Sequence, residues 1–138
     1  HSIEQPIRQH QWARMAELCA SSPIPIALDE ELIGVNMTQM KQDLLDRIRP
    51  QYIILKPSLH GGMRGTREWI DLANARGIGS WITSALESNV GLNAVAQLAA
   101  DIYGPDIRMP QGLGTGQLFT DNMPMNLEIK GDKIWKTK

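Results

Sequence analysis

Polar residues recur at an almost constant interval along this chain, each at the end of a short apolar run. The positions are Glu4, Asp29, Lys56, Ser84 and Gly112, so the intervals are 25, 27, 28 and 28 residues. An interval of this length accommodates one strand, one helix and the turns that join them. Because a helical crossover makes the strands on either side of it parallel, the spacing predicts four consecutive βα units and a final strand in one parallel sheet.

The apolar runs before these residues are typical of strands that are buried on both faces. They are Pro23–Leu28, Tyr52–Leu55 and Gly79–Ile82, with a stub at Ser2–Ile3 and a weaker candidate at Met109–Gly112. Between the runs, apolar residues recur at helical spacing and predict four amphipathic helices. The predicted helix faces are Trp12, Met15, Ala16 and Cys19; Met37, Met40, Leu44, Leu45 and Ile48; Trp69, Ile70, Leu72 and Ala73; and Val90, Leu92, Val95, Ala96, Leu98 and Ala99.

The end of the chain has a different pattern. Leu127–Ile129 and Lys133–Trp135 flank the turn-forming pair Gly131-Asp132, which predicts a small hairpin.

Composition excludes several classes of protein. The chain has 138 residues and is 42% hydrophobic, and 14 basic residues balance 15 acidic ones. This balance argues against a nucleic-acid-binding surface, which requires a basic excess. The single cysteine excludes a disulfide framework and cysteine-cluster zinc sites. No apolar run approaches the roughly 20 residues of a membrane helix, so we expect a cytoplasmic protein that interacts with neither membranes nor nucleic acid.

Two α/β architectures accommodate such a sheet. A flavodoxin-like, doubly wound sheet fits the length and would make the chain a complete, non-catalytic binding domain. The other is the C-terminal half of a (β/α)8 (TIM) barrel, whose chemistry lies at the carboxyl ends of successive strands. Glu4, Asp29, Lys56 and Ser84 fall at these ends, which favours the barrel.

Three of the strand-end residues are candidates for catalysis. Glu4 and Asp29 follow neighbouring strands, and two carboxylates about one strand spacing apart suit a hard cation such as Mg²⁺. The alternative is that each acid caps the following helix. Lys56 directly follows a buried strand, where a lysine acts as an acid, a base or an electrostatic clamp; otherwise its stem extends along the core to solvent. The three histidines show no ligand spacing, and we expect them to be structural or solvent-facing.

Short motifs at these positions resemble the enolase superfamily. Ile3-Glu4-Gln5-Pro6, Ile26-Ala27-Leu28-Asp29-Glu30 and Ile54-Leu55-Lys56-Pro57 are similar to the ends of its fourth, fifth and sixth barrel strands. Within the superfamily, the chain most resembles the o-succinylbenzoate synthase branch of menaquinone biosynthesis. Ser84–Leu92 and Gln111–Gly116 resemble the seventh- and eighth-strand segments of that branch. The resemblance extends from residue 2 to about residue 122.

The resemblance implies a lyase that dehydrates a cyclohexadiene carboxylate, with Mg²⁺ as cofactor and Mn²⁺ as an alternative. Glu4 and Asp29 would be two of three metal ligands, Glu30 an acid that orients neighbouring groups, and Lys56 the catalytic sixth-strand lysine. Substrate contacts would come from Ser84 and from the segment that contains Gly112, Gly114 and Thr115. N-acylamino acid racemase or a related epimerase of the same superfamily is the alternative activity.

The resemblance also implies that parts of the enzyme lie outside this sequence. The first of the three metal ligands, on the third strand, is absent from it, as are a second-strand lysine and the capping domain. We therefore expect residues 1–122 to be a partial barrel domain whose partner is the N-terminal half of the same enzyme, and to be inactive alone. Residues 123–138 would be a C-terminal tail that packs on the capping domain.

Overall fold

Four of the five predicted apolar runs form one sheet in the computed structural model, which describes residues 1–137. Its strands are β1 (Ile3–Glu4), β2 (Ile26–Leu28), β3 (Tyr52–Leu55) and β4 (Gly79–Ile82). The pairings of β1 with β2 and of β2 with β3 are parallel. All three residues of β2 are buried, as are the last three of β3, so the predicted burial on both faces is confirmed for these strands.

The order of the strands distinguishes the two architectures. Each strand lies beside the one that precedes it in the chain, in the order β1-β2-β3-β4. A doubly wound sheet reverses direction at a switch point, so neighbours in the chain are not all neighbours in the sheet. Sequential order in one direction is that of a (β/α)8 barrel. The barrel prediction is confirmed, and the doubly wound alternative is wrong.

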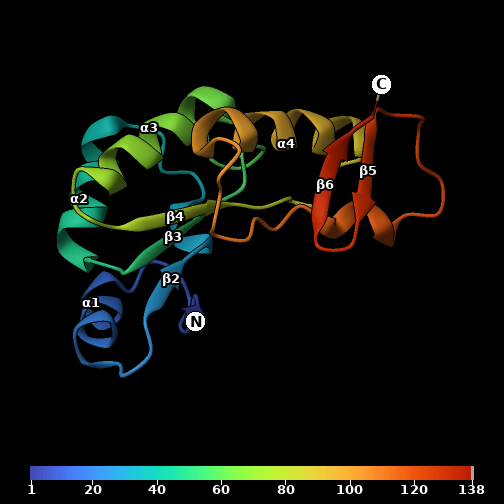
Figure 1. Ribbon diagram of the computed structural model, residues 1–138. Helices are drawn as coiled ribbons and strands as arrows, with labels where there is room; N and C mark the ends of the chain where they lie inside the picture. The colour runs from blue at the N-terminus through green and yellow to red at the C-terminus, as the bar shows by residue number, and fades with distance from the viewer. Residues whose placement is uncertain (138) are drawn as a thin grey trace. The chain divides into compact units, whose positions relative to one another are not determined.

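The chain forms two compact units, His1–Trp81 and Ile82–Lys138, and Lys138, the last residue of the predicted tail, lies outside the described residues. In the first unit, helices α1 (Trp12–Ser21), α2 (Thr38–Ile48) and α3 (Gly62–Asn74) follow strands β1, β2 and β3 in turn (Figure 1), and α2 packs against both α1 and α3. A short 3₁₀ helix, η1 (Glu30–Leu32), follows β2.

The predicted face of α2 is wrong at its first turn. Met37 and Met40 are exposed, whereas Lys41 is buried together with Leu44 and Leu45. A lysine takes the core position because its ammonium finds partners on α3: the carboxylate of Glu68 at 2.8 Å and the carbonyl of Gly65 at 3.5 Å. A buried charge is tolerated when it is paired in this way.

One residue connects the strands of the first unit at their amino ends. The amide nitrogen of Gln51 donates to the carbonyl of Ile26, and its own carbonyl accepts from the amide of Gly79 at 3.0 Å. Its side chain accepts from the amide of Ile26 at 2.9 Å and donates to the carbonyl of Cys19 at 3.1 Å. The start of β3 is thereby tied to β2, to β4 and to the end of α1.

The second unit contains helix α4 (Asn89–Tyr103), the 3₁₀ helix η2 (Gly114–Leu118) and an antiparallel pair, β5 (Leu127–Lys130) with β6 (Lys133–Lys136). The predicted hairpin is confirmed, and Gly131 has the positive φ of +63° that its turn requires. Across residues 1–137, no helix is long and apolar enough to cross a bilayer.

The weak strand candidate Met109–Gly112 is not a strand. Only Gly112 pairs, as a single parallel bridge with Thr83. Pro110 has no amide hydrogen to donate to a ladder, and the side chain of Gln111 takes the place of backbone pairing by accepting from the amide of Ile82 at 2.7 Å. Pro110 and the side chain of Gln111 therefore reduce the predicted fifth strand to a single bridge.

Candidate functional site

The structure brings Glu4, Asp29 and Lys56 together at the carboxyl ends of β1, β2 and β3. The ammonium of Lys56 forms an ion pair with Oδ2 of Asp29. The carboxyl group of Glu4 lies close enough to Asp29 for the two acids to interact. The parallel pairing of the three strands explains this convergence, since the residue after each strand emerges at the same edge of the sheet.

The carboxylate of Asp29 is completely buried, and its Oδ1 has no hydrogen-bond partner within residues 1–137. Burial and the adjacent carboxylate of Asp29 raise the pKa of Glu4, while the charge of Lys56 acts in the opposite direction. Two neighbouring carboxylates with an unsatisfied buried oxygen are a donor set that a hard divalent cation neutralises. The residues present therefore fit Mg²⁺, although the described part of the chain holds no cluster of three or more ligating side chains.

His60 fixes the backbone of Lys56. The amide of Lys56 donates to Nδ1 of His60 over 2.8 Å, and the carbonyl of Lys56 accepts from the amides of Leu59 and His60. The imidazole is 1% exposed, and burial lowers the pKa of His60 to about 4, so the ring is neutral at physiological pH. The sequence predicted only that the histidines are structural or solvent-facing, and it did not predict this contact with Lys56.

A second set of hydrogen bonds joins the loops after β1 and β2. The side-chain oxygen of Gln5 accepts from the amides of Asp29 and Glu31. The buried carboxylate of Glu31 accepts from the amide of His10 and from the indole of Trp12, both at 2.8 Å. Sequence reasoning singled out Glu30, which is exposed, and missed Gln5 and Glu31; the orienting role of Glu30 stays a prediction.

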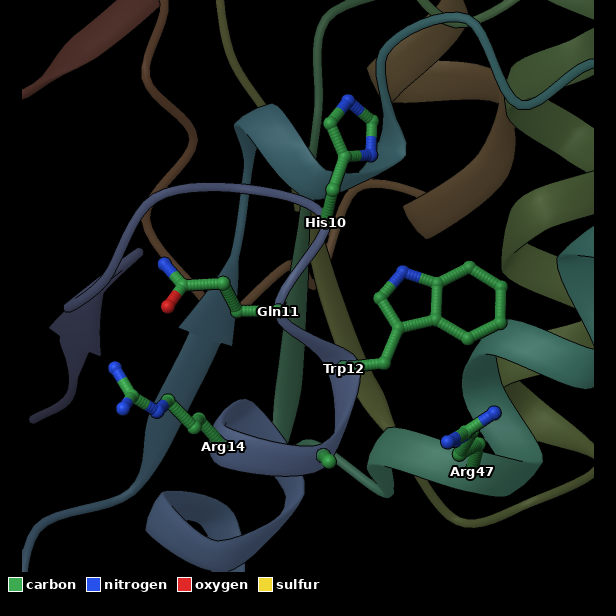
Figure 2. Close-up of a pocket in the computed structure, with 6 residues that line it drawn as sticks. His10, Gln11, Trp12, Arg14 and Arg47 are labelled. Carbon is green, nitrogen blue, oxygen red and sulfur yellow. The ribbon is translucent and has the colours of Figure 1, made fainter.

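The first unit also has a hollow at the start of α1. It has a volume of about 530 Å³ and is lined by His10, Gln11, Trp12, Ala13, Arg14 and Arg47. In Figure 2, Arg14 and Arg47 lie on opposite sides of the start of α1, so their charges do not converge. Glu4, Asp29 and Lys56 do not line this hollow, and the strand-end residues remain the candidate site.

In the second unit, Ser84 belongs to a tight turn. Its hydroxyl donates to Oε2 of Glu87 over 2.6 Å and accepts from the amide of Leu86 over 2.9 Å. The same Glu87 oxygen also accepts from the amide of Ala85. Leu86 has a φ of +65°, a conformation that is strained for a leucine. The role of Ser84 in substrate binding stays a prediction, and the turn explains how its side chain is oriented.

The predicted eighth-strand segment meets Ser84 at one point. The carbonyl of Gly112 accepts from the amide of Ser84 at 3.0 Å and from the hydroxyl of Thr83 at 2.9 Å. A Cβ at Gly112 would come within 2.1 Å of that hydroxyl, so only glycine fits. Gly114 begins η2, and Oγ1 of Thr115 is buried with no partner in the described residues. Substrate contacts by these residues stay predictions.

Comparison with known proteins identifies relatives of the whole segment. The model of the family described as "Enolase C-terminal domain-like" matches residues 1–124. The o-succinylbenzoate synthase of Desulfotalea psychrophila is 66% identical over 131 residues, which are 95% of this chain and 34% of that protein. A chloromuconate cycloisomerase from Cupriavidus pinatubonensis is 31% identical over 112 residues, 78% of this chain and 29% of that protein.

A solved structure gives the same result. The crystal structure of MenC from Desulfotalea psychrophila superposes with a TM-score of 0.90 at 63% identity, covering 97% of this chain and 36% of that one. The chain thus spans about a third of the length of the relatives that it matches. Its likeness to complete barrel enzymes over only this share agrees with the predicted C-terminal half of a barrel.

Proposed function

We propose a function from one premise: this chain belongs to the enolase C-terminal domain-like family. The full-length protein dehydrates a cyclohexadiene carboxylate to o-succinylbenzoate in a Mg²⁺-dependent reaction. The observation that carries the chemistry is that Asp29, which interacts with Glu4 and Lys56, keeps a buried oxygen with no partner within residues 1–137. The substrate class rests on the similarity to a protein named o-succinylbenzoate synthase at 66% identity.

Glu4 and Asp29 would hold the metal ion. Asp29 offers Oδ1, since its Oδ2 is engaged by Lys56, and Glu4 offers a carboxylate that is destabilised by its acidic neighbour. When bound, Mg²⁺ supplies positive charge that stabilises negative charge developing on the substrate's carboxylate. A third ligand would come from outside the sequence given.

Lys56 would supply a second positive charge. Its side chain is 20% exposed, whereas Asp29 is buried, so the lysine is within reach of solvent while the carboxylate that it pairs with is not. In the reaction, the C–H bond α to the carboxylate breaks, its proton passes to a base, and the hydroxyl group leaves with a proton as water. We assign the base to a lysine outside this sequence and give Lys56 the role of stabilising the anion that forms.

The small-molecule partner is therefore a carboxylate, and the macromolecular partner is the remainder of the same enzyme, against which residues 123–138 would pack. Mn²⁺ is expected to replace Mg²⁺ because both prefer oxygen ligands. We place the full-length enzyme in the cytoplasm.

The test is an assay of the full-length protein with the cyclohexadiene substrate. We expect turnover with Mg²⁺, loss of turnover on chelation by EDTA, and recovery when Mg²⁺ is restored. Calorimetric titration with Mg²⁺ should show binding that Asp29→Asn weakens at least about tenfold, with Glu68→Gln as a matched control at an ion pair elsewhere. Turnover that persists after complete removal of divalent metal would falsify the proposal.

The same preparation distinguishes the alternative activity. If N-acylamino acids are racemised and the diene is not dehydrated, the protein is a racemase of the family. The segment from Gly112 to Thr115 contains no acidic residue, so it has no carboxylate that could form an ion pair with the free amino group of a dipeptide substrate. This argues against a dipeptide epimerase.

A further inference from the structure

His60 has a polar atom that a purely structural residue would not need. Its Nδ1 accepts from the amide of Lys56, so in the neutral ring the hydrogen is on Nε2. Nε2 is buried and has no partner in residues 1–137. An unsatisfied buried donor costs stability, and an apolar side chain of similar size would avoid that cost.

The backbone of His60 is closely packed and hydrogen-bonded. A Cβ on Gly65 would come within 2.3 Å of the carbonyl oxygen of His60, so the first turn of α3 packs directly against this carbonyl. The amide of His60 donates to the carbonyl of Lys56 at 3.1 Å, and the amide of Gly62 donates to the carbonyl of Pro57 at 2.9 Å. The backbone of His60 is thus held by its own turn and packed against a helix.

Lys56 is consequently fixed at both ends. Its amide and its carbonyl are bonded to residue 60, and its ammonium is bonded to Asp29. The side-chain stem of a lysine is flexible, so the position of its Cα limits where its ammonium can be placed. A displacement of about 1 Å at a reacting group can cost roughly 100-fold in rate.

We propose that His60 is a positioning residue, whose Nδ1 holds the backbone of Lys56 so that the ammonium lies beside the carboxylates of Glu4 and Asp29. This proposal rests on the proposed function for its kinetic consequence. His60 itself does not touch the substrate and acts through Lys56.

Two substitutions separate this role from simple packing. His60→Asn keeps an acceptor on the same branch atom, Cγ, and loses volume. His60→Leu keeps apolar volume and loses the acceptor. If only packing matters, the leucine variant should be the better enzyme; if the acceptor matters, the asparagine variant should be.

In the full-length protein we expect His60→Leu to lower kcat about 10- to 100-fold with KM within about threefold of the wild type. His60→Asn should stay within about threefold in kcat, although it should melt at the lower temperature of the two. A folded His60→Leu variant with wild-type kcat would overturn the proposal, as would equal loss of kcat in both variants.

Two spectroscopic measurements do not depend on activity. Nitrogen-15 NMR of labelled histidine in the full-length protein should show His60 protonated at Nε2 and not at Nδ1; the opposite tautomer overturns the proposal. The Lys56 side-chain resonance, assigned with Lys56→Arg, should shift in His60→Leu but not in His60→Asn. If the wild type shows no dehydration or α-proton exchange, the proposed function fails, and the Lys56 resonance still decides the role of His60: identical spectra in all three proteins refute it.

Discussion

Lys41 and Lys56 both form ion pairs within the first unit, and the two pairs differ in which partner is buried. In the first, the cation is buried and the carboxylate reaches solvent: the side chains of Lys41 and Glu68 are 2% and 33% exposed. In the second, the anion is buried and the cation reaches solvent: Lys56 is 20% exposed and Asp29 is 0% exposed.

The pairs also differ in whether their polar atoms are satisfied. The ammonium of Lys41 has the carbonyl of Gly65 as a further partner and lies 5.2 Å from the ring centroid of Trp69. The other oxygen of Glu68 accepts from the hydroxyl of Thr38. Asp29, in contrast, keeps a buried oxygen without a partner in the described residues. A satisfied pair joins two helices, whereas an unsatisfied one has capacity left for a ligand.

The largest effect should come from Lys56→Ala. We expect kcat/KM of the full-length enzyme for dehydration to fall about 10²- to 10³-fold, because a charge aimed at the developing anion is lost. Steady-state kinetics with saturating Mg²⁺ measures this, and Lys56→Arg controls for charge without the same geometry. Retention of more than a tenth of the activity by Lys56→Ala would remove Lys56 from the mechanism.

Lys41→Ala should have the opposite profile. We expect it to lower the free energy of unfolding by about 2–4 kcal/mol, because a buried stem and an ion pair are both lost, and to leave kcat unchanged. Denaturant titration of the full-length protein measures the loss of stability, and steady-state kinetics measures kcat. Lys41→Met, which keeps the stem volume, should lose less stability. A drop in kcat without a drop in stability would contradict the distinction between the two pairs.

The buried imidazole beside Lys56 should make stability depend on pH. Burial lowers the pKa of His60 to about 4 in the folded protein, whereas an unfolded histidine titrates near 6.5. Between these values the unfolded chain binds the extra proton, so stability should fall as the pH falls from about 6.5 to about 4, by up to about 3 kcal/mol. Melting of the full-length protein across this range, with His60→Asn as reference, measures the difference. Equal slopes in both proteins would show that His60 titrates normally.

The smallest effect should come from a pair on the surface. Nε and Nη2 of Arg76 lie 2.7 and 2.9 Å from the two carboxylate oxygens of Asp46, and this contact lowers the pKa of Asp46. Because the aspartate is 61% exposed, solvent screens the attraction. Asp46→Asn should leave the melting temperature and kcat nearly unchanged. A large loss of stability would mean that pairing alone, and not burial, decides the importance of an ion pair here.

Sequence periodicity predicted β2 and β3 well because a strand buried on both faces is a run of apolar residues with a polar residue at its end. Such a pattern needs no knowledge of other elements. The predicted burial is wrong for β1, whose two residues are exposed, and for β4, of which only Ile82 is buried. Periodicity also placed Glu4, Asp29 and Lys56 at one edge, and the structure confirms that they lie together. The exposed methionines of α2 show where periodicity misleads, because a lysine whose partners lie on another helix is not visible in its own helix.

Two other features could not be predicted for the same reason. His60 contacts the amide of Lys56 only because the intervening turn folds the ring back, and a spacing of four residues occurs in many unrelated places. The choice between Glu30 and Glu31 depends on η1, whose turn directs the second acid inward, to the amide of His10 and the indole of Trp12. Both depend on backbone geometry that local composition does not specify.

The bonds of Gln51 have a consequence for engineering. This one residue joins β2, β4 and the end of α1 to the start of β3, at the end of the strands remote from the three charged residues. The hydrogen bonds that hold the strands together therefore lie at the amino ends of the strands, whereas the residues to which we attribute catalysis lie at the carboxyl ends. Library mutagenesis directed at the loops that carry the charged residues should yield many folded proteins with altered specificity, provided that Gln51 is left unchanged.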